Sequence, residues 1–435
     1  MKLVIQNGRL LDPSSEVDRE VDIIIEDGTI RDIVTAGSAP ITTANLIDAK
    51  GKWVTPGLVD LHVHLREPGC EYKEDIASGS RAAAAGGFTS VVAMANTQPV
   101  IDSAELVRSV AERGAEVGLC RVLPVGAVTM GQGGETLAPF AEMARAGAVA
   151  VSDDGQVVKN PELMRRALEY AMDHHDLPLL THADEPALNA GGFMHEGNVS
   201  TRLGLRGIPG VAEDVAVARD VALACYTGGR LHVCHVSTAA AVQTIRDAKA
   251  RGVRVTAEAT PHHFALTHAA VEGYDTATKM VPPLRTEEDR RAIVLGLRDG
   301  TIDAIATDHA PHSSIEKDVT FADAANGIIG LQTALPLTLD LWRAGELPLL
   351  IAIARLTSGP AAALGLSCGT VAVGAVADLA VIDPEASWRL DHESNYSKSV
   401  NSPFWNRPLT GRTDATILGG EVVYRRDRQP VWSTM

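Results

Sequence analysis

The sequence lacks an excess of positive charge and any long run of apolar residues. Its 435 residues include 39 Lys and Arg against 55 Asp and Glu, a formal net charge of −16. A chain this acidic has no general basic surface to neutralise phosphates, which argues against nucleic acid or an anionic membrane as a partner. No run approaches the roughly 18 apolar residues that a membrane span requires.

The sequence also has few cysteines and no recognisable leader. Its five cysteines are odd in number and scattered without a C-x-x-C pair, which is typical of reduced thiols in a cytosolic protein. The first residues, MKLVIQNGRLLDP, include Asn, Gly and Arg and do not resemble a signal peptide. We therefore expect a cytoplasmic protein.

Both ends of the chain have the texture of short β-strands. Residues 1–55 and 366–435 alternate short apolar runs with turn signals, among them a hairpin turn at Asp27-Gly28. Neither end is long enough to bury a face alone. We expect the two ends to form one small β-sandwich domain.

The middle of the chain, residues 56–365, alternates eight strand-like runs with helix-like stretches. This alternation predicts a catalytic (β/α)8 barrel of the TIM type within an α/β fold. A doubly wound open sheet is the alternative, but no G-x-G-x-x-G or P-loop follows any of the runs. The eight runs are LVDLHVHL, FTSVVAMAN, RVLPVGAVT, AVAVSDD, LPLLTHAD, LHVCHVS, VRVTAEAT and IDAIATDH.

Histidines and carboxylates end most of these runs, where a barrel gathers its active site. His62 and His64 are two apart on a strand, so they share a face and can hold one ion, although two satisfied core histidines are the alternative for this pair alone. Nitrogen and carboxylate ligands without thiolates favour zinc, with manganese or cobalt as substitutes, and six of them suit two ions. The six candidates are His62, His64, Asp154, His182, His235 and Asp308.

Five motifs together resemble the dihydroorotase family of the amidohydrolase superfamily. The D-x-H-x-H pattern alone is shared with hydantoinases, allantoinases and deaminases, whereas HLREPG combined with ATDHAPH is much more specific. The resemblance covers essentially the whole chain, including the split β domain. The motifs are DLHVHLREPG (60–69), SDDG (152–155), THADE (181–185), CHVST (234–238) and ATDHAPH (306–312).

The resemblance implies a metal centre with one or two Zn²⁺ ions, two being expected. His62, His64 and Asp308 would bind the first zinc, His182 and His235 the second, and Asp154 would bridge them. Neighbouring strand residues face opposite ways, so the sequence leaves Asp153 as an alternative to Asp154. A carboxylated Lys159 is a second alternative, because some relatives bridge with a modified lysine.

The resemblance also implies the reaction, a reversible cyclisation of N-carbamoyl-L-aspartate to L-dihydroorotate in de novo pyrimidine (UMP) biosynthesis. Zinc lowers the pKa of its water toward about 7, so a bridging hydroxide would attack the ring amide. Asp308 would accept the hydroxide proton and pass it to the departing ring nitrogen as the catalytic acid and base.

Arg66 is the candidate for recognising the substrate carboxylate, because it lies two residues beyond His64 on the same side. Other family positions would contact the same group or the ring, although Asn also caps loops and an exposed His can be idle. The region HSSIEKDVTFADAANG could act as a lid. The predicted substrate-binding residues are His64, Arg66, Asn96, His312, Asn326 and Gly327.

One position departs from the family pattern, since KMVPPLR (279–285) has Val281 where relatives usually have Asn.

Two rival functions are another cyclic amidohydrolase, which would not need Arg66, and a non-catalytic partner of aspartate transcarbamoylase, which would have lost metal ligands. The nearby histidines of Pro261-His262-His263 are interpreted as structural or as support for the ligands. A homodimer and a transcarbamoylase partner are both compatible with the resemblance.

Overall fold

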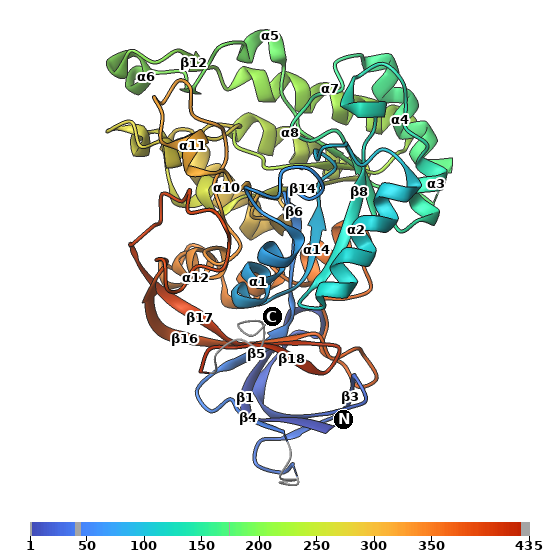
Figure 1. Ribbon diagram of the computed structural model, residues 1–435, viewed down its shortest axis with the longest axis vertical. Helices are drawn as coiled ribbons and strands as arrows, with labels where there is room; N and C mark the ends of the chain where they lie inside the picture. Colours follow the sequence, from blue (N-terminus) through green and yellow to red (C-terminus); the bar gives the residue numbers. More distant parts are fainter. Residues whose placement is uncertain (1, 40–44, 174, 428–435) are drawn as a thin grey trace.

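The computed structural model describes residues 2–39, 45–173 and 175–427. Residues 1, 40–44 and 428–435 of the predicted β domain and residue 174 of the predicted barrel therefore lie outside the described residues. A barrel surrounded by helices occupies one end of the molecule, and a smaller sheet occupies the other (Figure 1). In the described part of the chain, no helix combines the length and the apolar character that crossing a bilayer would require.

The barrel consists of eight parallel strands, and each of them falls within one of the eight runs. The predicted (β/α)8 barrel is therefore confirmed. A parallel bridge between Val63 and His309 joins the first strand to the chain after the last one and nearly closes the barrel. The strands, in spatial order, are β6 (Leu58–Val63), β7 (Phe88–Ala93), β8 (Arg121–Gly126), β9 (Ala150–Ser152), β10 (Leu179–Thr181), β13 (Leu231–Val233), β14 (Val255–Ala259) and β15 (Ala304–Ile305).

Helices follow the strands and cover the outside of the barrel (Figure 1). The α-helices are α1 (Ile76–Gly86), α2 (Ala104–Val117), α3 (Phe140–Arg145), α4 (Pro161–Asp173), α5 (Pro186–Asn189), α6 (Asn198–Leu203), α7 (Val211–Thr227), α8 (Ala239–Ala250), α9 (Pro261–Ala265), α10 (Glu287–Asp299), α11 (Ser314–Lys317), α12 (Ala334–Arg343), α13 (Leu349–Ala354) and α14 (Ser358–Leu364). The 3-10 turns are η1 (Pro13–Ser15), η2 (Met130–Gln132), η3 (His268–Val271) and η4 (Thr276–Thr278), and the short strands β11 (Met194–His195) and β12 (Gly207–Ile208) pair beside α6.

Helix α1 illustrates how the local sequence sets these elements. Asp75 caps its start, where the carboxylate accepts a 2.6 Å hydrogen bond from the Ser78 backbone N–H. Gly87 ends the helix in the left-handed conformation, with φ of 94°, which glycine adopts without strain. The small side chains of the run Ala82–Ala85 are buried against the barrel and the small sheet.

Both ends of the chain contribute to one mixed sheet. Asp27 and Gly28, with φ of 49° and 82°, form the expected tight turn between antiparallel β2 and β3. Strand β5 ends at Pro56, and β6 begins the barrel at Leu58, so the sheet leads directly into the barrel. The strands are β1 (Lys2–Asp12), β2 (Val17–Glu26), β3 (Thr29–Thr35), β4 (Leu46–Asp48), β5 (Trp53–Pro56), β16 (Leu379–Arg389), β17 (Pro408–Leu418) and β18 (Glu421–Arg425).

The apolar core is divided according to the two parts of the fold. Alternate residues such as Val59 and Leu61 on β6 fill the barrel interior, because successive strand residues face opposite sides. A larger cluster lies between the strands and the helices. The mixed sheet has its own core, which includes Ile5, Ile23 and Leu379. The polar residues at the strand ends therefore project from a rigid apolar support.

Candidate metal and substrate site

A pocket of about 510 Å³ opens at the carboxyl ends of the barrel strands. Five of the six predicted metal ligands line it, and the sixth, His62, is completely buried beside them. Every predicted substrate-binding residue also lines it. The predicted residues in the wall are His64, Arg66, Asn96, Asp154, His182, His235, Asp308, His312, Asn326 and Gly327.

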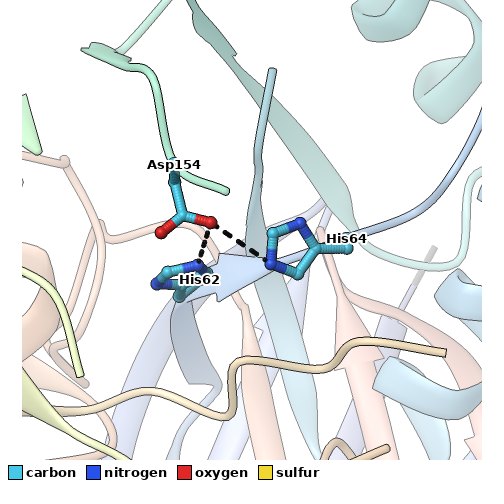
Figure 2. Close-up of side chains that lie close together, drawn as sticks. All are labelled: His62, His64 and Asp154. Atoms are coloured by element: carbon cyan, nitrogen blue, oxygen red, sulfur yellow. Dashed lines mark ion pairs between the residues drawn. The ribbon is translucent and has the colours of Figure 1, made fainter. Parts of the chain in front are cut away.

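The Asp154 carboxylate lies between two pairs of histidines. Its Oδ2 atom is 3.2 Å from Nε2 of His62 and 3.5 Å from Nε2 of His64, the arrangement drawn in Figure 2. Its Oδ1 atom is 3.4 Å from Nδ1 of His182 and 3.3 Å from Nε2 of His235. One carboxylate thus presents one oxygen to each pair, which is the geometry of a bridging ligand.

Asp308 adds a second carboxylate on the side of His62 and His64. Its Oδ1 atom is 3.0 Å from Nε2 of His64 and 3.6 Å from Nε2 of His62. Burial raises the pKa of Asp308, but hydrogen bonding to His64 and the charge of His62 outweigh burial and lower it below its usual value. Asp308 is therefore ionised, as a metal ligand or a general base must be.

Two side chains behind the histidines fix the orientation of their rings. Nδ1 of His62 donates to Oε1 of Glu258 at 2.7 Å, and Nδ1 of His64 donates to Oδ1 of Asn96 at 2.8 Å. Each ring therefore presents Nε2 toward Asp154, and Nε2 is the atom that would bind a metal ion there. Burial raises the pKa of Glu258, but the charge of His62 and the hydrogen bond from His232 outweigh burial and hold it at about 2.

Glu258 is a functional candidate that the sequence analysis did not single out. It lies on β14 within the run VRVTAEAT and is completely buried. An acidic residue inside an apolar strand was the available signal, because a buried carboxylate requires a partner. Its partner, His62, is remote in sequence, so the pairing could not be deduced from local spacing.

The residues at this site fit a metal centre. Nε2 of His62 is buried and makes no hydrogen bond of acceptable geometry, although Asp154 Oδ2 lies 3.2 Å away. Donor atoms converge within 4.8 Å of one another in two groups that share Asp154, one with His62 and His64 and one with His182 and His235. Imidazole nitrogens gathered around carboxylates, one of them an orphaned nitrogen that faces Asp154, are the donor set that a borderline divalent ion prefers.

A third group of donors lies on the other side of His62 and comprises His62, Cys234 and Glu258. Here Nδ1 of His62 is already bonded to Glu258. Burial raises the pKa of the Cys234 thiol, so the sulfur is protonated and a poor ligand. This group therefore supports the ring of His62 and does not form a separate metal site.

Asp153 and Lys159, the two alternatives to Asp154 as the bridging residue, have different surroundings. Asp153 Oδ1 accepts hydrogen bonds from the backbone of Val128 and Thr129 at 2.8 and 3.0 Å, and its Oδ2 accepts from the Thr129 hydroxyl at 2.5 Å. Lys159 has an exposed side chain at the pocket wall. Asp153 belongs to none of the convergent groups of His, Cys, Asp and Glu found among the described residues.

Three residues of the site have strained backbone conformations. Arg66, His235 and Asp308 have φ values of 62°, 34° and 46°, in the left-handed region that non-glycine residues rarely adopt. Such conformations cost of the order of 1–3 kcal/mol each and persist where surrounding contacts impose them. The chain turns sharply at these strand ends and directs these side chains into the pocket.

Arg66 contributes a positive charge to the pocket. Its Nε donates to the carbonyl of Pro311 at 3.2 Å, and no ion pair joins it to an acidic residue in the described ranges. Burial lowers its pKa from the usual 12.5, because the charged form is incompletely compensated. An anionic group of a ligand would supply the missing partner.

His312 lies beside Arg66 and is neutral. Burial and the charge of Arg66 lower its pKa to about 3. Its Nε2 donates to the carbonyl of Asn326 at 2.8 Å, so the 3.4 Å approach of Arg66 Nη2 to the same nitrogen places two donors face to face. Its Nδ1 is buried without a hydrogen-bond partner.

The region predicted as a lid is attached to the rim of the barrel by buried lysines. Lys317 Nζ donates to the carbonyls of Thr276 and Ala325 at 2.9 and 2.7 Å, and Lys279 Nζ donates to Ala322 and Ala324, both at 2.7 Å. Lid movement stays a prediction.

Val281 and the two histidines after Pro261 have different positions relative to the pocket. Val281 lines the pocket, where its side chain offers no hydrogen bond. His262 and His263 are buried outside the pocket wall, and Nε2 of His263 donates to the Pro282 carbonyl at 3.0 Å.

A parallel barrel with histidines and carboxylates at its strand ends defines an amidohydrolase, and an amidohydrolase family model matches residues 205–424. A dihydro-orotase-like family model matches residues 51–241. The dihydroorotase of Pelobacter propionicus is 55% identical over 98% of this chain and 100% of its own length, and that of Syntrophotalea carbinolica is 56% identical over 98% and 99%. The chain therefore belongs to the dihydroorotase family of cyclic amide hydrolases.

Solved structures of other cyclic amidases share the fold. The L-hydantoinase of Arthrobacter aurescens has a TM-score of 0.87 at 25% identity and covers 99% of this chain and 97% of its own. The dihydropyrimidinase of Brevibacillus agri has a TM-score of 0.85 at 23% identity, with 99% and 96% covered. At this identity the likeness concerns architecture, so substrate preference has to be argued from the pocket.

Proposed function

We propose that this protein is a zinc-dependent dihydroorotase that interconverts N-carbamoyl-L-aspartate and L-dihydroorotate. The proposal rests chiefly on Arg66. This residue places a positive charge in the pocket that Asp154 also lines, and no ion pair joins it to an acidic residue among the described residues. Dihydroorotate has a carboxylate next to its cyclic amide, whereas hydantoin and dihydrouracil have the amide without that carboxylate.

His62, His64 and Asp308 would hold one zinc, His182 and His235 would hold another, and Asp154 would bind both. The bound metal supplies Lewis acidity that activates water and the amide carbonyl at neutral pH. Glu258 and Asn96 keep the rings of His62 and His64 in the orientation that points Nε2 toward Asp154.

Asp308 moves the proton in both directions of the reaction. During hydrolysis its carboxylate accepts a proton from the attacking water, the ring C–N bond breaks, and the proton passes to the departing nitrogen. During ring closure Asp308 takes the proton from the ureido nitrogen, the C–N bond forms, and the proton leaves with the expelled water. The depressed pKa of Asp308 provides the ionised form that each direction requires at its start.

Arg66 orients the substrate by pairing with its exocyclic carboxylate, and the guanidinium fork matches two carboxylate oxygens. Asn96 uses Oδ1 for His64, so its Nδ2 remains to donate to the same carboxylate. His312 and the backbone of Asn326 and Gly327 form the adjoining wall and meet the ring. His64 contacts the substrate from the metal side.

We place the reaction in pyrimidine (UMP) biosynthesis in the cytoplasm, with a small-molecule substrate. A homodimer and an aspartate transcarbamoylase partner remain predictions from the family resemblance. A purely non-catalytic role is disfavoured because all six candidate ligands are present. His62, His64, His182 and His235 surround the Asp154 carboxylate, and Asp308 lies beside His64.

The decisive experiment compares the initial rates of ring opening for dihydroorotate and hydantoin by zinc-loaded protein and by the same preparation stripped of metal. We expect turnover of dihydroorotate only, and only with metal. Turnover of hydantoin instead would assign the protein to another class of cyclic amidase. Inactivity toward both substrates with metal bound would favour the non-catalytic role.

A further inference from the structure

The chain between β16 and β17, residues 390–407, leaves the small sheet and extends along the barrel toward α11 (Figure 1). Residues of this connection contact loops that line the pocket, although none of them belongs to the pocket wall. Asn401 is buried within it, with 5% of its surface exposed. From the sequence, this connection is predicted only to belong to the small β domain.

The Asn401 side chain joins two loops of the pocket. Its Oδ1 accepts a hydrogen bond from the His312 backbone N–H at 3.1 Å. Its Nδ2 donates to the carbonyls of Ala310 and Gly327, both at 3.0 Å. An amide is the side-chain group that combines an acceptor with two donors on one short arm, so the position suits Asn specifically.

The backbone of Asn401 strengthens the same junction, because its carbonyl accepts from the Ile329 N–H at 3.0 Å. The two loops also meet directly, through the hydrogen bond from His312 Nε2 to the Asn326 carbonyl. A backbone hydrogen bond from the Ala310 N–H to the Ile328 carbonyl at 2.8 Å also joins the loops, and further hydrogen bonds between them pass through Asn401. The position of His312 relative to Gly327 therefore depends in large part on Asn401.

The connection is held firmly enough to serve as a support. Glu74 is completely buried and accepts from the Ser397 hydroxyl, from the Lys398 N–H at 3.1 Å and from Nε2 of His309 at 3.2 Å. The Ser399 hydroxyl donates to the Lys73 carbonyl at 2.8 Å. His309 directly follows Asp308, so one network reaches both the connection and the catalytic strand end.

We propose that Asn401 is a positioning residue, which sets the separation of His312 and Gly327 and thereby the affinity of the pocket for substrate. It acts through these two residues and does not touch the substrate. The inference rests on the proposed function, since it takes the wall formed by His312 and Gly327 as the substrate-binding wall.

The test replaces Asn401 by Asp, which keeps the shape and loses both N–H donors. The carbonyls of Ala310 and Gly327 then face a carboxylate, and losing two hydrogen bonds should raise KM for dihydroorotate by about 10- to 100-fold. We expect kcat to change much less and the metal content to stay the same. Asn401→Ser keeps one donor, should fold if the Asp variant does not, and should have an intermediate KM.

Asn395 provides the matched control. Its Nδ2 donates to the carbonyls of Ser397 and Ser399 at 2.9 and 3.0 Å, the same chemistry within the connection but without a contact to either pocket loop. Asn395→Asp should leave KM near the wild-type value. An equal rise in KM for Asn395→Asp and Asn401→Asp would assign the effect to the packing of the connection and overturn the proposal.

The outcomes separate this inference from the proposed function. Wild-type protein that fails to open dihydroorotate contradicts the proposed function, whereas an active wild type with unchanged KM in both Asn401 variants contradicts only the role of Asn401. Crystal structures of wild type and Asn401→Ser supply a readout that needs no activity. An unchanged separation of His312 and Gly327 in the variant would refute the proposal.

Discussion

Asp153 and Asp154 are neighbours in the chain, yet their carboxylates contact different groups. Asp153 accepts hydrogen bonds from the loop after β8, at Val128 and Thr129, whereas Asp154 presents one oxygen to each of two histidine pairs. Burial alone raises the pKa of Asp154, but the charge of His62 and hydrogen bonds from His182 and His235 hold it well below its usual range. Asp153 thus stabilises the loop after β8, whereas Asp154 is the proposed bridging ligand.

These different contacts predict different consequences of replacing Asp153 or Asp154 by alanine. Asp154→Ala should lose most of its bound zinc, because both candidate ion positions lose a ligand. Asp153→Ala should keep the metal and instead lower the melting temperature, because the Val128 and Thr129 donors lose their acceptor. Elemental analysis after gel filtration, together with thermal melts, measures both effects. Loss of metal from Asp153→Ala alone would exchange the two roles.

Arg66→Gln should raise KM for dihydroorotate by about 10- to 100-fold, the usual cost of losing a charge-assisted hydrogen bond of 1.5–3 kcal/mol. Dihydrouracil, the same ring without the carboxylate, should inhibit the variant and the wild type equally. Steady-state kinetics with dihydroorotate, with and without dihydrouracil, measures both effects. Equal losses of affinity for the two compounds would contradict the assignment of Arg66 to the carboxylate.

Asp308→Asn should reduce kcat by roughly 10²- to 10⁴-fold, because the amide cannot accept and return the proton. The fold should persist, since the amide preserves the shape of the side chain. Circular dichroism tests whether the fold persists, and stopped assays in both reaction directions measure kcat. A variant that retains wild-type kcat in either direction would remove Asp308 from proton transfer.

Glu258→Gln should weaken zinc binding by about 10- to 100-fold, because His62 loses the carboxylate that fixes its tautomer and orientation. Competition with a metal chelator measures the affinity. Glu74→Gln is the control, since Glu74 is an equally buried carboxylate bonded to His309, which is outside the candidate ligand set. Similar zinc affinities for the two variants would argue against a special role for Glu258.

His195 predicts a pH effect remote from the metal centre. Burial and the charge of Arg285, whose Nη1 is 3.3 Å from His195 Nδ1, lower the pKa of His195 to about 4. Because an unfolded His titrates near about 6.5, the unfolded chain binds more protons between pH 4 and pH 6.5, and stability falls as the pH falls through that window.

The difference in melting temperature between wild type and His195→Gln should therefore shrink or reverse from pH 7.5 to pH 5. Metal-free protein is used for both, so that loss of zinc at low pH does not contribute. A difference that is constant with pH would show that His195 does not titrate in this way.

The barrel and the types of residue at its mouth can be predicted from the sequence. Each of the eight apolar runs contains a strand, because strand periodicity is local. Several intervening helices, among them α1, α2 and α8, also begin at a capping side chain. Parallel strands end at one face, so the predicted convergence of His62, His182, His235 and Asp308 follows from topology once the barrel is recognised.

The packing of the folded chain is needed to tell whether Asp153 or Asp154 faces the histidines. It is also needed to identify the distant groups that support them. The choice between Asp153 and Asp154 depends on how the chain turns after β9. Glu258 meets His62, and Asn401 meets His312 and Gly327, across long separations in sequence. Hydrogen bonds between remote segments depend on the packing of loops, and no local pattern in the sequence specifies that packing.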